Sequence, residues 1–239
     1  MVNLLIKASE AIGIKILTNR QVISVEKKGI SFLIRTEFKS KTGSETHSFQ
    51  ADMVVHGAGR VIEDLCLEKA EVKIEKGAII VDKHMRTSNT CIYAGGDCAL
   101  EGMQLTSVAK LQGEIVAVNI LDENSVEADY TGIPIAVNTI PVMASVGISD
   151  SKYSNNYKVI FRDRSSWQTT KIAEIEFAAS KVILDEANDC IIGAHILGPH
   201  AEEAINIFAA VMRLRLKASD IQKMIFTYPT VCSDIPYML

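Results

Sequence analysis

The sequence predicts an α/β region followed by an α+β region, and three observations lead to this fold class. Helix-like and strand-like segments alternate in the first half of the chain, as they do in α/β folds. In the second half, strand-like segments follow one another at short intervals and an apolar helix comes after them, which predicts an antiparallel sheet with helices on one side. A polar stretch over residues 122–132 separates the two patterns. We therefore expect two domains, residues 1–129 and residues 130–239.

The first region opens with a predicted helix over residues 3–12, which Gly13 ends. A short strand is expected at residues 14–17. Alternating apolar and polar residues then predict three strands, QVISVEKK, SFLIRTEF and THSFQADMVV, with the polar turn KSKTGSE before the third. The apolar run in DMVVHGAGR, residues 52–60, predicts a buried strand that runs into a pair of glycines.

The rest of the first region combines short strands with one long helix. Residues 63–76 are charged and are expected to be a connecting stretch. Two short strands are predicted in AIIVDKHMRTS and CIYAGGD, residues 78–88 and 91–97. From Leu105, apolar residues at positions 108, 111 and 115 predict an amphipathic helix.

The second region is predicted to hold strands at residues 157–162, 171–178, 181–185 and 190–198. The sequence EANDC supplies a hairpin turn between the last two. A helix over residues 202–216 is apolar on most sides, so we expect it to be covered by its own sheet and, on the other side, by another chain. Ser219 and Gln222 have the spacing of a capping box and predict one more short helix.

Composition narrows the function classes. The 239 residues carry a formal net charge of -4, which argues against a nucleic-acid binder with a basic face. The cysteine count of 5 is odd and no C-x-x-C occurs, so we expect neither a disulfide scaffold nor a metal site, and a reducing, cytoplasmic setting. Glu10 interrupts the apolar start, which argues against a signal peptide. Pro134, Asn138 and Pro141 interrupt the longest apolar stretch, so no membrane span is expected.

The segment TSNTCIYAGGDC, residues 87–98, places a short apolar stretch directly before two glycines and a carboxylate. One interpretation is a tight turn at the end of a strand. The other is a site where the backbone comes close to a ligand and Asp97 accepts a hydrogen bond from a hydroxyl group.

The segment TS-x-x-x-IYAGGD at residues 87–97 resembles the second FAD-binding motif of the pyridine nucleotide–disulfide oxidoreductases. Glutathione reductase, dihydrolipoamide dehydrogenase and mercuric reductase belong to this family. LTSVA, residues 105–109, is similar to the family's LTPVA segment, which opens a helix below the flavin. GAHILGPHAEEAINIFAAVM with the later YPT resembles the family's dimerisation domain, and DMVVHGAGR resembles the ATGR segment that closes its NAD(P)-binding domain.

The resemblance implies a partial FAD/NAD(P)-binding region followed by a dimerisation domain, as in the C-terminal half of such an enzyme. The family's first FAD-binding G-x-G-x-x-G, its redox pair C-x-x-x-x-C and the G-x-G-x-x-G of its NAD(P) domain do not occur in the sequence. A truncation, a split gene and a degraded gene are all consistent with this pattern. We expect secondary FAD contacts, NAD(P)H as reductant of the complete enzyme, weak or no FAD binding by this chain alone, and a homodimer through residues 130–239. The alternative is a catalytically inactive dimerisation or regulatory module of the same family.

The resemblance also assigns candidate cofactor contacts. It implies that Asp97 accepts a hydrogen bond from the FAD ribityl chain while the preceding glycine lets the backbone come close. Thr106 and Ser107 begin a helix whose N–H groups and dipole favour negative charge on a reduced flavin, although the family has proline where Ser107 stands. Arg60 could face a phosphate or be a solvated surface group. The cofactor-binding candidates are Gly59, Gly96, Asp97, Gln104, Leu105, Thr106 and Ser107.

Tyr228 is the candidate catalytic residue, because the family's disulfide reductases carry a histidine there and a glutamate at the position of Ser233. A tyrosine keeps its proton at neutral pH and is a poor base, so we expect a completed enzyme to reduce small disulfides slowly. Asp234 could substitute in part for the glutamate. Cys91 and Cys98 could form a redox pair, but two small buried residues are the simpler interpretation. His195 is expected to be structural.

Overall fold

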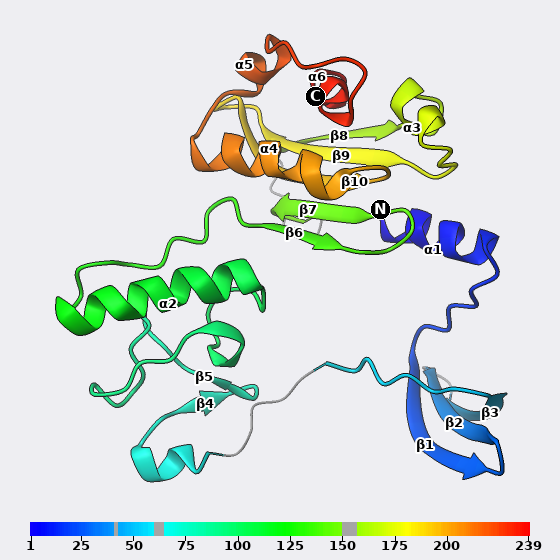
Figure 1. The fold of residues 1–239 in the computed structure, drawn as a ribbon, viewed down its shortest axis with the longest axis vertical. Helices are drawn as coiled ribbons and strands as arrows, with labels where there is room; N and C mark the ends of the chain where they lie inside the picture. The colour runs from blue at the N-terminus through cyan, green and yellow to red at the C-terminus, as the bar shows by residue number, and fades with distance from the viewer. Residues whose placement is uncertain (41–42, 60–64, 150–156) are drawn as a thin grey trace. The chain divides into compact units, whose positions relative to one another are not determined.

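The computed structural model describes residues 1–40, 43–59, 65–149 and 157–239 (Figure 1). Its contacts divide the chain into two compact units, Ser9–Arg60 and Met1–Ala8 with Val61–Leu239. The first helix, α1 (Val2–Ala11), begins in the larger unit and agrees with the prediction, since Gly13 follows it with a φ of 89°. In the described residues, no helix is long and apolar enough to cross a membrane.

The smaller unit is an antiparallel meander of β1 (Arg20–Lys28), β2 (Ser31–Ser40) and β3 (Gly43–Ala51). The side chain of Arg20 lies over the rings of two phenylalanines, Phe38 at 5.7 Å and Phe49 at 6.0 Å. The pairing of β1, β2 and β3 confirms the three predicted strands, although the third ends at Ala51.

Two strand predictions in this unit are wrong. Residues 14–17 form no strand, and neither do the described residues of the run 52–60. Met53 and Val55 are 75% and 82% exposed rather than buried. An apolar run becomes a buried strand only beside another strand, and in the described part of this unit none pairs with either segment. Arg60 lies outside the described residues.

The larger unit begins with short elements packed under one long helix. These are the 3-10 helix η1 (Leu67–Ala70), the strand pair β4 (Ile74–Glu75) and β5 (Ala78–Ile79), the 3-10 helix η2 (Gly96–Cys98) and the helix α2 (Thr106–Leu121). Their common core contains Val72, Ile79, Val81, Met85, Ala99 and Ile115.

The two strands predicted in residues 78–88 and 91–97 form only in part. Pairing is limited to Ala78–Ile79 and to single bridges, one of which joins Arg86 to Tyr93. Turn hydrogen bonds hold the rest of this segment, for example from the Ala94 amide to the Met85 carbonyl at 3.0 Å. Apolar residues of this segment do pack in the core, but the backbone forms compact turns instead of a sheet.

The C-terminal part is a five-stranded antiparallel sheet in the order β6-β7-β10-β9-β8. Predicted strands are confirmed for β8 (Tyr157–Asp163), β9 (Ala179–Asp185) and β10 (Cys190–Leu197), while β6 (Pro134–Val137) and β7 (Met143–Gly147) were not predicted. β6 is an edge strand, and Pro134 stands at its first position, where a proline removes no needed hydrogen bond.

The predicted strand at residues 171–178 is wrong. The chain forms the short helix α3 (Gln168–Ile172) there and then a turn, before β9 begins at Ala179. Thr169 and Thr170 are buried inside α3, and the Thr169 hydroxyl donates to Asp234. Tertiary contacts of the threonines thus decide against the alternating pattern of KIAEIEFA.

Three helices share one core with the sheet: α4 (Ala201–Arg213), α5 (Ala218–Gln222) and α6 (Ile235–Met238). The 3-10 helix η4 (Val231–Asp234) directly precedes α6. Figure 1 shows α4 lying along β10, and it also packs against β7 and β6. The sheet side chains in this core point to the face that α4 covers, and they include Ala144, Val146, Val182, Ala194 and Ile196.

The expectation that α4 is apolar on most sides is wrong, and cover of its outer side by another chain stays a prediction. The side chains of α4 divide into a buried stripe with Ile205 and Phe208 and an exposed stripe with Glu203, Asn206 and Arg213. Phe208 is 0% exposed within this single chain. The helix is therefore an ordinary amphipathic one, and the argument for a second chain has to come from other residues.

Candidate functional site

The two glycines of the segment TSNTCIYAGGDC form a tight turn against helix α2. Gly96 begins η2 with a φ of 80°, a conformation that favours glycine. A Cβ atom at Gly95 would lie 3.2 Å from the Cβ of Gln112. The sequence explained this glycine pair by close approach to a ligand, whereas the structure also explains it by close approach to α2. Asp97 follows within η2 and is half-buried.

The start of α2 lies beside this turn, because α2 contacts η2. Thr106 is the first residue of the helix, as expected, and both Thr106 and Ser107 are exposed. Leu105 occupies the N-cap position, and its side chain cannot accept a hydrogen bond from the first turn. The amide groups of that turn and the positive end of the helix dipole are therefore available to an anionic or electron-rich group.

Gln104 connects the two parts of this site. Its Nε2 donates to the backbone oxygen of Asp97 at 3.0 Å. The Leu105 carbonyl in turn accepts from the Ala109 amide at 2.8 Å, which fixes the first turn of α2. Six of the seven cofactor candidates therefore belong to one local structure, made of Gly96, Asp97, Gln104, Leu105, Thr106 and Ser107. The seventh, Gly59, lies in the smaller unit with a φ of 91°.

Sequence reasoning missed two buried polar residues on α2. Gln112 is 0% exposed and Asn119 is 1% exposed, and they lie on the buried face with Val108 and Ile115. The signal was present, since both amides stand at positions that the helical period places among the apolar ones.

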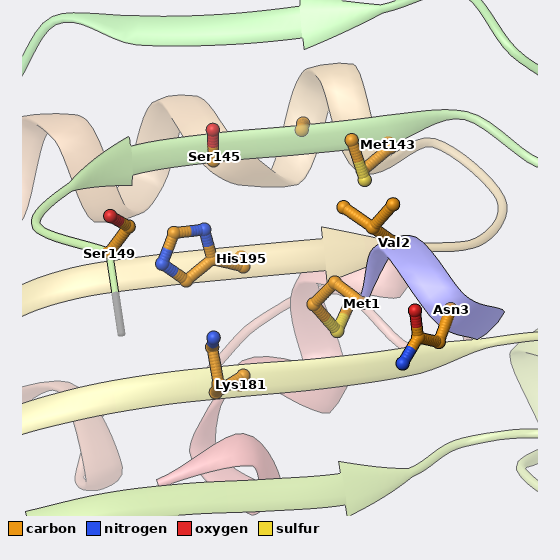
Figure 2. Close-up of a pocket in the computed structure, with 9 residues that line it drawn as sticks. Met1, Val2, Asn3, Met143, Ser145, Ser149, Lys181 and His195 are labelled. Atoms are coloured by element: carbon orange, nitrogen blue, oxygen red, sulfur yellow. The ribbon is translucent and has the colours of Figure 1, made fainter. Parts of the chain in front are cut away.

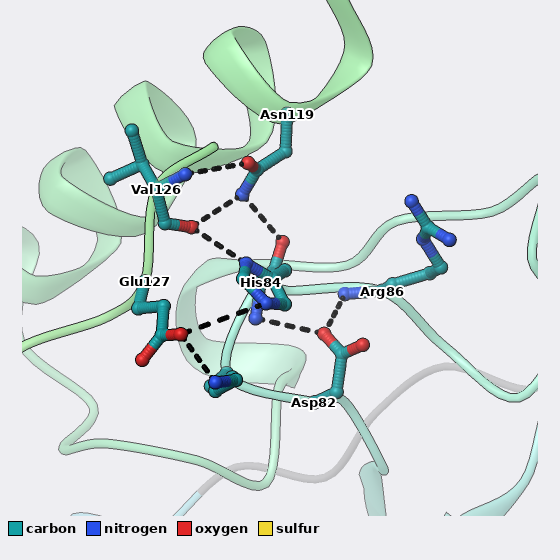
Figure 3. Close-up of polar contacts among 7 residues, drawn as sticks. Asp82, His84, Arg86, Asn119, Val126 and Glu127 are labelled. Atoms are coloured by element: carbon teal, nitrogen blue, oxygen red, sulfur yellow. Dashed lines mark hydrogen bonds and ion pairs between the residues drawn. The ribbon is translucent and has the colours of Figure 1, made fainter. Parts of the chain in front are cut away.

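Asn119 belongs to a second polar group, which fastens the stretch after α2 (Figure 3). Its Nδ2 donates to the carbonyl oxygens of Val126 at 2.8 Å and His84 at 3.1 Å, and its Oδ1 accepts from the Val126 amide at 3.0 Å. Nδ1 of His84 lies 3.0 Å from the Val126 oxygen. Glu127 pairs with Lys83, which lowers the pKa of its carboxyl. This group is structural, because the Asn119 amide is directed at backbone atoms of the chain itself.

Tyr228 is 68% exposed, and its hydroxyl donates to Oε1 of Gln168 at the start of α3. Ser233 is used elsewhere, in a capping box in which its amide donates to Oγ1 of Thr230 and its Oγ accepts from the Thr230 amide, both at 3.2 Å. The geometry does not support Asp234 as a substitute for the family's glutamate. Its carboxylate binds Arg164 at 3.3 Å and Thr169 instead of Tyr228.

The cysteines give no redox pair in this structure, since none of the five forms a disulfide. Cys91 is exposed, contrary to the expectation of two buried residues, while Cys98 is half-buried and donates to the Gly95 oxygen at 3.3 Å. Burial raises the pKa of the Cys232 thiol, and Glu203 and Asp234 add to the effect. Among the described residues, no group of three His, Cys, Asp or Glu side chains could hold a metal ion.

His195 faces a cavity of about 440 Å³ on the side of the sheet opposite α4 (Figure 2). The strand register places it between Ser145 of β7 and Lys181 of β9. Its Nε2 lies 3.0 Å from the backbone oxygen of Ile148, just after β7. This contact with the backbone agrees with a structural role.

Comparison with known proteins gives consistent matches along the chain. Residues 2–113 match the pyridine nucleotide-disulphide oxidoreductase domain, and residues 133–238 match the dimerisation domain of the same family. An uncharacterized 19.7 kDa protein in a mercuric resistance operon of Staphylococcus aureus is 42% identical over 178 residues, which are 72% of this chain and 99% of that protein.

Two enzymes are also similar. Glutathione reductase of Burkholderia cepacia is 30% identical over 193 residues, 78% of this chain and 43% of the enzyme. Dihydrolipoyl dehydrogenase of Corynebacterium glutamicum is 28% identical over 239 residues, 96% of this chain and 50% of the enzyme. The chain thus spans about half the length of these two curated enzymes.

Solved structures share the fold. A mutant of the HOCl-induced flavoprotein disulfide reductase RclA from Escherichia coli, in its Cu(II) complex, has a TM-score of 0.86 at 21% identity and covers 100% of this chain and 54% of that one. LpdA from Mycobacterium tuberculosis has a TM-score of 0.83 at 24% identity, over 97% of this chain and 50% of that one.

Proposed function

Because this chain belongs to the pyridine nucleotide-disulphide oxidoreductase family, we propose that it supplies secondary FAD contacts and the dimer face of an NAD(P)H-dependent flavoprotein oxidoreductase. One observation carries the proposal. The turn with Gly96 and Asp97 lies against the start of α2, whose first turn has no side-chain cap. Two features that suit a flavin therefore meet in one place.

The residues fit the group that the family implies. The Asp97 carboxylate would accept a hydrogen bond from a ribityl hydroxyl, and such charge-assisted bonds are short and strong. The amide groups of Thr106 and Ser107, at the positive end of α2, would stabilise negative charge on the flavin's pyrimidine edge. When bound, FAD supplies the capacity to take up a hydride from NAD(P)H and pass electrons on.

We predict that this chain alone binds FAD weakly or not at all. A pyrophosphate needs a glycine-rich turn at a helix start, and the sequence contains no G-x-G-x-x-G. The absorption spectrum of the purified protein, with and without added FAD, tests this directly. Flavin recovered in a one-to-one ratio with the chain would show that the chain is a complete flavoprotein.

The alternative is an inactive dimerisation or regulatory module of the same family, which acts by pairing with itself or with a longer relative. The short Staphylococcus aureus protein favours it, because this chain matches 99% of that protein's length. Sedimentation together with the flavin spectrum separates the two possibilities. A stable dimer that takes up no FAD, even when mixed with an N-terminal FAD-binding half of a relative, would favour the module.

Tyr228 is proposed as a proton donor of the complete enzyme, in which disulfide reduction would be slow. Its exposed side chain supports a contact with a substrate or partner, and in this structure its hydroxyl donates a hydrogen bond to Gln168. Replacing Tyr228 by histidine together with Ser233→Glu should accelerate disulfide turnover in a completed enzyme, and no acceleration would contradict the proposal. The five cysteines form no disulfide, which supports a reducing compartment, and a cytoplasmic location is part of the proposal.

A further inference from the structure

Gln112 uses its entire side-chain amide to hold three separate segments. Its Oε1 accepts from the Gly96 amide at 2.6 Å. Its Nε2 donates to the Glu101 oxygen and to the hydroxyl oxygen of Tyr130, both at 2.8 Å. The Tyr130 hydroxyl in turn faces the sulfur of Met85 at 3.9 Å. One buried amide therefore joins the diglycine turn, the loop after it and the stretch that leads to the dimerisation domain.

Glycines surround this amide, and their geometry shows how tightly it is enclosed. A Cβ atom at Gly95 would lie 3.2 Å from the Gln112 Cβ, and one at Gly102 would lie 3.0 Å from its Nε2. Gly102 also has a φ of 87°. The chain thus comes close to Gln112 on two sides, so the amide cannot rotate away without moving the backbone of the turn.

We infer that Gln112 is the positioning residue of the flavin-contact turn, and that it holds Asp97 where a ribityl hydroxyl can reach it. The inference rests on the proposed function for the flavin contact, but the hold on the turn is a property of the chain itself. The Gly96 amide is bound to Gln112, so η2 begins at a fixed distance from α2. The neighbouring Asp97 and the first turn of α2 then keep a constant separation, as a shared ligand requires.

The connection to Tyr130 extends this role. Tyr130 lies in the stretch that precedes Gly132 and β6, just before the dimerisation domain. Movement of this stretch would be transmitted to the diglycine turn through one side chain. Gln112 thus fixes the distance between the diglycine turn and the segment that leads to the dimerisation domain.

The decisive test is hydrogen exchange at the Gly96 amide in the full chain without flavin. Gln112→Met keeps the volume but removes the acceptor, and should make this amide exchange about tenfold faster, as expected for loss of one hydrogen bond. Gln112→Glu keeps an acceptor oxygen and should preserve most of the protection. Asn119→Leu is the matched control, since it removes another buried amide from the same helix and should leave Gly96 unchanged.

Three results would overturn the inference. One is unchanged Gly96 exchange in folded Gln112→Met. Another is equal loss of protection in Asn119→Leu, which would indicate general loosening of α2. The third comes from titration with FAD of the chain mixed with an N-terminal FAD-binding half of a relative, in which Gln112→Met should weaken binding as much as Asp97→Asn does. Weaker binding in Asp97→Asn alone would contradict the role of Gln112.

The proposed function fails separately. If Asp97→Asn leaves the FAD affinity unchanged while Gln112→Met still exposes the Gly96 amide, the turn is held by Gln112 but does not serve a flavin. This outcome contradicts the proposed flavin contact but agrees with the role of Gln112 in holding the turn. FAD affinity and Gly96 exchange therefore test the proposed function and the role of Gln112 separately.

Discussion

Arg164 is the largest of the fully buried side chains in the described part of the chain. Its Nη2 lies 3.3 Å from the Asp234 carboxylate, and its guanidinium lies 5.4 Å from the ring centre of Trp167. Burial lowers the pKa of Arg164, and Asp234 acts in the opposite direction. Within the described residues, its Nε and Nη1 have no hydrogen-bond partner, so the pair depends strongly on this one carboxylate.

We predict that Asp234→Leu lowers the free energy of unfolding by about 3–5 kcal/mol, because it leaves a buried charge without its partner. The double variant Arg164→Met with Asp234→Leu should recover most of that loss, since no charge remains to be buried. Chemical denaturation of the three proteins measures the difference. A double variant as unstable as Asp234→Leu would indicate that packing, not charge, accounts for the effect.

At the scale of elements, α5 depends on a residue from outside the helix. Lys217 occupies its N-cap position and does not cap it with its side chain. Instead, Asp189 accepts two hydrogen bonds from the start of α5. Its backbone oxygen accepts from the Ala218 amide at 2.8 Å, and its side-chain carboxylate accepts from the Ser219 amide at 3.2 Å. Bonds from Ser219 lower the pKa of Asp189, and Lys217 and Lys223 contribute less. The capping box expected at Ser219 is thus replaced by the β9–β10 turn.

This arrangement predicts a loss of α5 protection in acid. The pKa of Asp189 is lower in the folded than in the unfolded chain, so its contribution is present above the ordinary aspartate pKa of about 4 and is lost as the pH falls through the folded value. Amide exchange at Ser219, corrected for its intrinsic rate, should increase as the pH falls below about 4. Asp189→Asn should remove this dependence, whereas Asp185→Asn, in the same hairpin, should retain it.

The regular strands were predictable because alternation along β8, β9 and β10 reflects one covered and one less covered face of a sheet. The strand expected at 171–178 failed because Thr169 binds Asp234, which lies far along the chain. The flavin-like turn was found from its glycines and Asp97. The role of Gln112 was not found, since it depends on contacts with three separate segments that no local pattern records.

For the whole molecule, the question is which surface would pair two chains. The helix α4 no longer supplies the argument, because Phe208 is buried against its own sheet. Large exposed apolar side chains do occur elsewhere in residues 130–239, and several lie between α4 and η4. Those in this stretch are Leu214, Leu216, Met224, Ile225 and Tyr228. Such a concentration on a single chain is typical of an interaction surface.

We predict a twofold-symmetric homodimer through residues 130–239 with Ile225 in its interface. Ile225 is 98% exposed, so Ile225→Asp cannot disturb the core of the chain, but it would bury a charge in a self-complementary contact. Sedimentation should show a dimer for the natural chain and at least a tenfold weaker association for the variant, as loss of about 2 kcal/mol at an anchor residue implies.

Ile30→Asp is the matched control for this dimer prediction, because Ile30 is 96% exposed but lies in the smaller unit. It should leave the association unchanged. Phe208→Asp should unfold the protein instead of separating intact subunits, which circular dichroism would detect, since Phe208 has no exposed surface. A natural chain that sediments as a monomer at micromolar concentration would contradict the dimer. Equal association of Ile225→Asp and the natural chain would place the interface on another part of the surface.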